Sequence, residues 1–184
     1  MTEKEKMEHQ KLYDANYDKE LEAERIQCKS LCQKYNNLPM ENIDERHTFI
    51  KSIIGSTGKN VHIEPDFWCD YGYRICLGEN FYANHGVVML DAGGISFGDN
   101  VFIAPQCGFH TSGHPLEAEV RNTPLEYAKP IKVGDSVWFG AGVQVCPGVT
   151  IGSNVVIGAG SVVIEDIPSN CVAVGNPCRV VKEI

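Results

Sequence analysis

The sequence lacks a long apolar run, an apolar N-terminus and any excess of positive charge, and each absence removes a class of protein. The first ten residues, MTEKEKMEHQ, are mostly charged or polar, so we expect no signal peptide. No run of the chain is long and apolar enough to span a bilayer, so we expect no membrane-spanning segment. Sixteen Lys and Arg against 24 Asp and Glu give a net charge of −8, which disfavours nucleic acid and membrane surfaces as partners. A chain of 184 residues is long enough for one domain with a core.

The eight cysteines contain no C-x-x-C motif, so neither a zinc ribbon nor a thioredoxin-type site is expected. Cys28 and Cys32 lie four residues apart on a predicted helix, and Cys107 stands where a six-residue repeat would bury its side chain. We therefore expect reduced thiols that act as small hydrophobic residues in a cytoplasmic protein, in preference to disulfides or metal ligands.

Residues 133–168 repeat every six positions, and this period predicts the fold. The first place of each unit is a large apolar residue, and the fifth is apolar in all units but one: Val133, Phe139, Val145, Ile151, Ile157 and Val163, with Val137, Val143, Val149, Val155, Ser161 and Ile167. A period of six fits neither a helix, at 3.6, nor a plain strand, at 2. It fits short strands separated by corners. Such units cannot bury an apolar face alone, so they are expected to stack into a parallel β-helix.

The rest of the chain divides into a helical segment and a continuation of the repeat. Residues 1–58 are predicted to be helical, with Asn42 and Glu45 three residues apart as an N-cap pair at the start of one helix. Residues 59–184 form the β-helix, in which the six-residue frame slips by two positions before Phe97. The frame stops over residues 109–130, which predicts a protruding loop, and loops on rigid scaffolds often carry function. A last strand and a C-terminal cap are expected after Pro168.

Several segments resemble one family along nearly the whole chain. They are TEKEKM and LYDAN near the start, CDYGYRICLGENFYAN at 69–84, IAP at 103–105, TSGHP at 111–115, EYAKPI at 126–131, VWFG at 137–140 and GNPCRVV at 175–181. These resemble the maltose and galactoside O-acetyltransferases, and CDYGY and VMLD are more similar to the maltose members. The resemblance implies a left-handed parallel β-helix that transfers acetyl from acetyl-CoA to a sugar hydroxyl without a metal. It also implies a homotrimer with active sites between subunits.

His114, in the GHP segment of the loop, is the predicted general base. The alternative is a surface loop histidine, and the similarity of GHP to the family favours catalysis. A sugar hydroxyl needs a base to take its proton as it attacks a thioester, and imidazole suits that task near neutral pH. Glu126 is a candidate for orienting the imidazole, as a carboxylate does in a hydrolase triad, although a solvated loop glutamate fits the sequence almost as well. Asn84 matches a catalytic position of the family. Its structural alternative is a corner residue with positive φ.

The resemblance also implies which residues meet the two substrates. The predicted sugar-binding residues are Asp14, Asp70, Tyr82, Asp91 and Trp138, with core packing the alternative for Trp138. Ala141 is expected to donate its backbone N–H to the oxyanion of the tetrahedral intermediate. The coenzyme is expected at Ala141, Ala159, Gly160, Arg179 and Lys182. Ile164 and Glu165 depart from the Thr-Lys of the family, and a carboxylate near phosphate predicts weaker binding of the coenzyme.

Three other functions stay open on the sequence alone. The same fold could acetylate a galactoside, an antibiotic, serine or a lipo-oligosaccharide. A β-helix carbonic anhydrase would need zinc held between subunits by His85, His110 and His114. A non-catalytic assembly module would bind no coenzyme.

Overall fold

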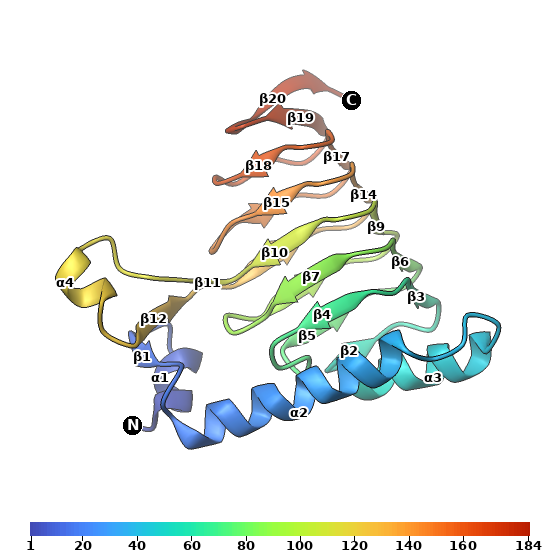
Figure 1. The fold of residues 1–184 in the computed structure, drawn as a ribbon. Coiled ribbons are helices and arrows are strands. Elements are labelled where there is room, and N and C mark those ends of the chain that lie inside the picture. Colours follow the sequence, from blue (N-terminus) through green and yellow to red (C-terminus); the bar gives the residue numbers. More distant parts are fainter.

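The computed structural model describes residues 1–184 as a solenoid of short parallel strands that stands on two helices (Figure 1). Its strands form three sheets. One sheet has seven strands, of which the last runs antiparallel to its neighbour: β3 (Val61–Ile63), β6 (Phe81–Ala83), β9 (Phe102–Ile103), β14 (Val137–Phe139), β17 (Val155–Ile157), β19 (Cys171–Gly175) and β20 (Cys178–Glu183). The β4 sheet contains β4 (Phe67–Cys69), β7 (Val87–Leu90), β10 (Gly108–His110), β15 (Gln144–Val145) and β18 (Val162–Val163). The β2 sheet contains β2 (Ser56–Thr57), β5 (Ile75–Leu77), β8 (Ile95–Phe97), β13 (Ile131–Val133) and β16 (Thr150–Ile151).

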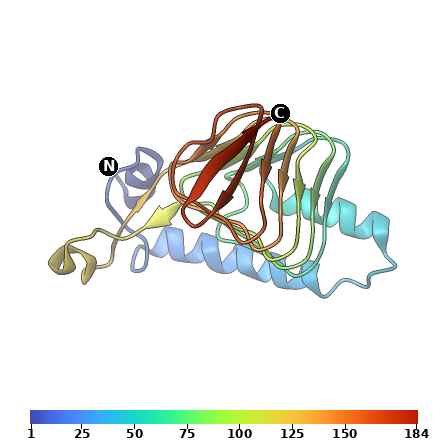
Figure 2. The same cartoon turned by 90° about the horizontal axis from the view of Figure 1, so that it is seen from above.

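This arrangement confirms the predicted left-handed parallel β-helix. Seen along the stack, the coils superpose (Figure 2). All twelve residues at the first and fifth places of the repeat are buried. The one polar member, Ser161, donates its hydroxyl to the Gly158 carbonyl at 2.6 Å and accepts from the Gly175 N–H at 3.0 Å, which satisfies a buried hydroxyl.

The slip in the repeat marks a longer corner. Val61 pairs with Phe81 and Ile75 with Ile95, whereas Val155 pairs with Cys171, so the early coils are longer than the late ones. The additional residues lie between the β4 sheet and the β2 sheet, at 70–74 and 91–94. Residues 111–130 leave the solenoid at this same side. We call these three segments the pocket corner.

Four phenylalanines form a continuous spine in the core. Phe81, Phe97, Phe109 and Phe139 meet edge to face, with successive ring centroids 5.1, 5.0 and 5.2 Å apart. This is the spacing that aromatic quadrupoles favour. The spine runs through coils on both sides of the loop, so it holds the base of the loop in a rigid frame.

The N-terminal segment covers the open end of the first coil. Its helices are α1 (Glu3–Glu8), α2 (Lys19–Asn36) and α3 (Ile43–Ile53), and α2 packs against β4 (Figure 1). The Asn36 side chain accepts from the Phe67 N–H at 2.9 Å and donates to the Phe67 carbonyl at 3.0 Å. It therefore satisfies backbone groups at the exposed edge of the bottom coil.

The structure differs from the predicted N-terminal segment in two details. The solenoid begins at β2, inside the range 1–58 that was predicted to be helical. Asn42 is the N-cap of α3, but its side chain makes no hydrogen bond to the helix backbone. It donates to the Glu45 carboxylate at 2.8 Å instead, since its backbone (φ −82°, ψ 59°) lacks the extended conformation of a capping residue. No helix of the chain is both long and apolar enough to cross a membrane.

A small antiparallel sheet ties the N-terminal segment to the loop. Its order is β1 (Tyr13–Asp14), β12 (Leu125–Ala128) and β11 (Ser112–Gly113), and the short helix α4 (Ala118–Arg121) lies at the tip of the loop. Figures 1 and 2 show this loop projecting away from the solenoid beside the N-terminus. The two segments that the sequence separates by a hundred residues thus share one sheet.

Candidate active site

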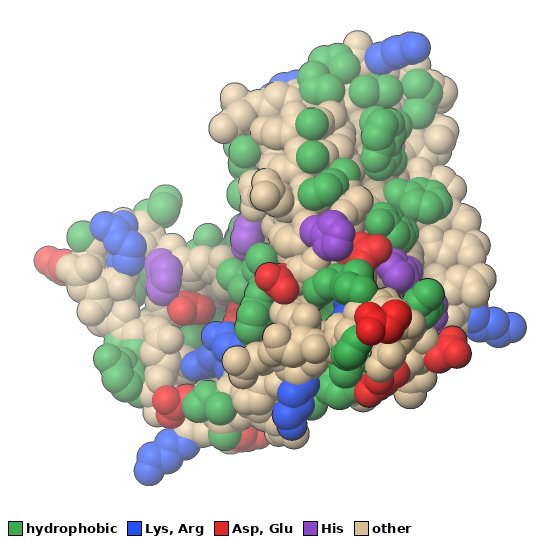
Figure 3. Space-filling view, turned by 45° about the vertical axis from the view of Figure 1, so that its right-hand side comes forward, with side chains coloured by type: hydrophobic (Ala, Val, Ile, Leu, Met, Phe, Trp, Pro, Cys, Tyr) green, Lys and Arg blue, Asp and Glu red, His purple; other side chains and the backbone are tan.

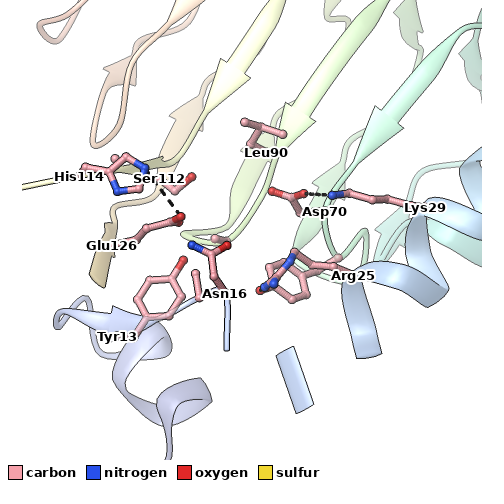
Figure 4. Close-up of a pocket in the computed structure, with 13 residues that line it drawn as sticks. Tyr13, Asn16, Arg25, Lys29, Asp70, Leu90, Ser112, His114 and Glu126 are labelled. Atoms are coloured by element: carbon pink, nitrogen blue, oxygen red, sulfur yellow. Dashed lines mark hydrogen bonds and ion pairs between the residues drawn. The ribbon is translucent and has the colours of Figure 1, made fainter. Parts of the chain in front are cut away.

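A cavity of about 460 Å³ opens at the pocket corner, where the loop, the N-terminal segment and α2 meet the solenoid (Figure 4). Its lining is mostly polar and comes from five parts of the chain: Tyr13, Ala15, Asn16, Arg25, Lys29, Asp70, Tyr71, Leu90, Ala92, Ser112, Gly113, His114 and Glu126. Three of the predicted site residues, His114, Glu126 and Asp70, are therefore brought together here.

His114 follows β11 and faces Glu126 of the neighbouring strand β12 across the mouth of the cavity (Figure 4). The imidazole Nε2 lies 3.9 Å from the Glu126 Oε1, and Nδ1 lies 3.4 Å from the Leu125 carbonyl. The His114 side chain is 51% exposed and that of Glu126 only 18%. Burial raises the pKa of Glu126, and the charges of His114 and Arg25 oppose this change. The carboxylate is thus placed to stabilise an imidazolium and to hold the ring.

The wall of the cavity carries cationic groups that the sequence analysis missed. Lys29 pairs with Asp70, with Nζ and Oδ1 3.6 Å apart, and Arg25 donates to the Tyr71 hydroxyl at 2.9 Å. Both cations lie on α2, one helical turn apart, so one face of α2 presents them to the cavity. The sequence contained one signal that could have identified them: two basic residues at i and i+4 on a predicted amphipathic helix.

Asp91 lies beneath the cavity and is fully buried, so within this chain it does not line the site. Its Oδ1 accepts from the backbone N–H groups of Asp70 at 3.0 Å and Tyr71 at 2.8 Å. The geometry makes Asp91 a positioning residue for the Asp70 turn in place of the predicted sugar contact. Burial raises the pKa of Asp91 to about 6, and the charge of Asp70 adds to that change.

The buried carboxyl of Asp91 predicts a pH-dependent stability. Its pKa is raised on folding from the ordinary 3.8, so the folded state binds the proton more tightly, and the free energy of unfolding falls as pH rises from 4 to 7. Asp91→Asn keeps an acceptor for both N–H groups and removes the charge. In urea unfolding, the free energy of unfolding of the variant should rise relative to that of the wild type over this range, by about 3 kcal/mol at most. The exposed Asp44→Asn serves as control, and a difference that stays constant with pH would contradict the assignment.

A second corner gathers the other predicted residues. It lies between the seven-stranded sheet and the β4 sheet and includes residues 84–86, 140–143 and 158–161. Asn84, Ala141, Ala159 and Gly160 are all in this second corner. The Ala141 and Ala159 N–H groups donate to no acceptor within the chain. Gly142 and Gly160 have φ of 71° and 69° and open space around them, so the backbone is accessible there.

The structural alternatives for Asn84 and Trp138 do not hold. Asn84 does not have a positive φ, since the left-handed residue of its turn is Gly86, and its Oδ1 accepts from the His85 N–H at 2.7 Å. Trp138 projects from β14 and is 55% exposed, so it is not a core residue. Tyr82 of β6 stacks on His62 with ring centroids 5.5 Å apart. These three side chains lie on or next to the seven-stranded sheet, and none lines the cavity with His114.

The comparisons with known proteins agree with this geometry. Residues 6–58 match the maltose acetyltransferase hexapeptide capping motif, and residues 130–165 match six bacterial transferase hexapeptide repeats. The structure of a maltose O-acetyltransferase from Clostridium difficile 630 is 51% identical, with a TM-score of 0.98, over 100% of this chain and 98% of that one. The galactoside O-acetyltransferase of Escherichia coli K12 is 42% identical over 89% of this chain and 81% of its own length. The chain belongs to the maltose and galactoside O-acetyltransferase family.

A further structure of this family, a galactoside acetyltransferase in complex with coenzyme A, is 40% identical, with a TM-score of 0.96, over 100% of this chain and 92% of that one. Membership makes this chain an acetyltransferase and confirms the resemblance found in the sequence. The family also explains why a capping helix precedes the solenoid, since the matched capping motif spans α2 and α3.

The remaining predicted residues of this acetyltransferase lie away from the cavity. Asp14 does not line it: its Oδ1 accepts from the N–H groups of Asn16 and Tyr17 at 3.1 and 2.9 Å and so shapes the turn that carries Asn16. Arg179 and Lys182 are exposed on β20. Arg179 lies 3.4 Å from Glu165, so the charge of the unusual glutamate is partly offset by a neighbouring cation. Within one chain, His85, His110 and His114 form no metal-binding group, and His110 faces Gln144 at 2.9 Å.

Proposed function

We propose that the protein is an acetyl-CoA-dependent O-acetyltransferase that acetylates a primary hydroxyl of a sugar such as maltose or glucose. The observation that carries this proposal is His114, held beside Glu126 at the mouth of a polar cavity large enough for a sugar. Asp70, Asn16, Arg25 and Lys29 supply donors and acceptors around that cavity. This pattern suits a polyhydroxylated acceptor, whose hydroxyls both donate and accept hydrogen bonds.

The reaction proceeds by direct transfer in a ternary complex. His114 takes the proton of the acceptor hydroxyl as its oxygen attacks the acetyl carbonyl. The Ala141 N–H, which has no acceptor within the chain, donates to the oxyanion. The tetrahedral intermediate then collapses, the carbon–sulfur bond breaks, and protonated His114 returns its proton to the leaving thiolate. Glu126 stabilises the imidazolium between these two steps.

This chemistry requires residues from both corners, and a homotrimer would supply them. His114 projects outward with the loop from the pocket corner, whereas Asn84 and Ala141 lie at the second corner. In a closed three-fold ring, the loop of one subunit would reach the second corner of the next. The solenoid face in Figure 3 carries columns of apolar side chains. On the seven-stranded sheet Phe102 and Trp138 are 50% and 55% exposed, which suits an interface between copies.

The coenzyme is proposed to run along the second corner. Ala159 and Gly160 would flank its pantetheine arm, because the Ala159 N–H has no acceptor within the chain and open space surrounds Gly160. Arg179 and Lys182 would supply positive charge to its phosphates. Acetyl-CoA and reduced thiols are both available in the cytoplasm, where we propose the enzyme works; the structure has eight free cysteines.

Thiol release from acetyl-CoA tests the acceptor. We expect release that depends on maltose or glucose and that exceeds the rates with a galactoside, with serine and without acceptor. Release that depends only on a galactoside, serine or an antibiotic would keep the acetyltransferase and replace the proposed substrate. No release with any acceptor, together with no binding of coenzyme A in calorimetry, would point to an assembly module.

A further inference from the structure

Three buried thiols converge directly behind the wall of the cavity. Cys28 and Cys32 lie on α2 and Cys69 ends β4. The Cys69 sulfur lies 3.4 Å from that of Cys28 and 3.6 Å from that of Cys32, and all three sulfurs are within 4.8 Å of one another. Their residues are 4%, 0% and 1% exposed. Cys107 is equally buried but has no second thiol beside it, so hydrophobic burial of a cysteine does not require such a cluster.

The spacing of the sulfurs matches the coordination of a metal by thiolates. A centre equidistant from three sulfurs spaced in this way lies roughly 2.0 to 2.4 Å from each, close to the metal–sulfur bond length of about 2.3 Å in zinc–thiolate sites. The three side chains come from only two elements, α2 and β4, and their backbones are held by packing and by the Asn36 contacts to β4. The ligands are therefore preorganised.

The ligand set defines the class of ion. Three thiols select soft ions and reject magnesium and calcium, which require oxygen ligands. Structural zinc takes four ligands, whereas this group contains three and no histidine or carboxylate. Soft ions that accept three sulfurs include monovalent copper and trivalent arsenic. Burial favours the neutral complex, because an uncompensated charge in an apolar core is costly.

We propose that Cys28, Cys32 and Cys69 form a binding site for a soft, three-coordinate thiophilic ion, with trivalent arsenic as the preferred occupant. Arsenous acid would exchange its three hydroxyl groups for the three thiols and release three water molecules. Three arsenic–oxygen and three sulfur–hydrogen bonds break while three arsenic–sulfur and three oxygen–hydrogen bonds form, and nothing is oxidised or reduced. A cavity of about 230 Å³ beside Cys28, Leu31 and Ile53 offers an entry between α2 and α3.

The thiol cluster is connected to the cavity through the chain itself. Cys28 precedes Lys29 and Cys69 precedes Asp70, and these two neighbours form the 3.6 Å ion pair on the cavity wall. An ion that fixes the three sulfurs also fixes the backbone from which this pair projects. If the proposed function holds, loading should change the KM for the acceptor several-fold and leave that for acetyl-CoA unchanged. The binding readout below does not depend on activity.

The test uses the full chain, reduced and kept without oxygen. Arsenite is added, unbound arsenic is removed by gel filtration, and arsenic per chain is measured by elemental mass spectrometry. We expect one arsenic per wild-type chain, with three sulfur neighbours in X-ray absorption spectra. Cys32→Ala should weaken binding at least ten-fold, whereas Cys107→Ala, a buried thiol outside the cluster, and Cys76→Ala, an exposed one, should bind as the wild type does.

Thermal unfolding monitors whether Cys32→Ala folds, and the absorption spectrum of the wild type provides an answer that requires no variant. A parallel titration with copper(I) against a chromogenic chelator distinguishes the occupants. Copper bound by three sulfurs without arsenic would support the site and overturn the preference for arsenic. Loading that survives Cys32→Ala, fewer than three sulfur neighbours, or a folded wild type that retains neither ion would overturn the site.

Discussion

Replacing His114 with alanine should lower kcat for sugar-dependent thiol release by about 10² to 10⁴-fold, the usual contribution of a general base. The methyl group cannot take the proton of the acceptor hydroxyl or return one to the leaving thiolate. The side chain is 51% exposed, so its removal should leave the fold intact. Stopped and continuous assays of thiol release, at saturating acceptor and acetyl-CoA, measure the effect.

Two companion variants show whether the loss belongs to the proposed site. Glu126→Gln keeps the shape beside His114 without its charge and should cause a smaller loss, because the base itself remains. His9→Ala, at the C-cap of α1 and outside the His114 cavity, should stay within two-fold of the wild type. Binding of coenzyme A, measured by calorimetry, should be unchanged in all three. A His114→Ala enzyme with wild-type kcat would remove His114 from the mechanism.

Mixing two inactive variants should restore activity if each site takes residues from two subunits. His114→Ala is defective in the loop of the pocket corner and Asn84→Ala in the second corner, so each homotrimer is expected to have little activity. In trimers assembled at random from equal amounts, about a quarter of the sites would combine an intact loop with an intact second corner. The whole refolded pool, homotrimers included, should therefore recover about a quarter of the wild-type rate.

Recovery of activity requires that subunits of both variants enter the same trimer, and this requirement provides a control. Mixing the two purified variants without denaturation and refolding should give only their average rate, if the assembled rings exchange slowly. Light scattering on the refolded mixture should report three chains per particle. Refolded trimers whose rate equals the average of the two variants would place His114 and Asn84 of one chain in the same site, against the arrangement of the two corners.

The six-residue period predicted the fold because burial follows the same period: the first and fifth residues of each unit are buried. Val133, Phe139 and Val145 begin consecutive units and all face the core, so the repeat could be aligned to strands and corners without any long-range information. The two-residue slip before Phe97 could also be detected in the sequence, but its structural consequence could not be predicted. The slip lengthens the pocket corner, which forms part of the cavity wall at Asp70 and Tyr71.

The role of a site residue could be predicted only where it depends on neighbours that are close in the sequence. His114 could be proposed from the chemistry of imidazole, its place in a loop and the similarity of the GHP segment to the family. Asp91 could not be assigned correctly, because a side chain that holds the Asp70 and Tyr71 N–H groups from below looks in sequence like one that faces a substrate. Arg25 and Lys29 were missed because only the packing of α2 across the first coil brings them to the cavity, and the sequence of α2 does not record that contact.

The sequence by itself determined the solenoid, the capping helices, the loop and its histidine, because these follow from periodicity, turn chemistry and resemblance along the chain. Only the tertiary structure decided which residues meet. It set His114 apart from Asn84 and Ala141 by placing them at different corners, and it brought Cys69 to Cys28 and Cys32. The physical reason is that contacts between elements depend on how α2 and the loop pack across the coils, and packing over such separations leaves no periodic mark in the sequence.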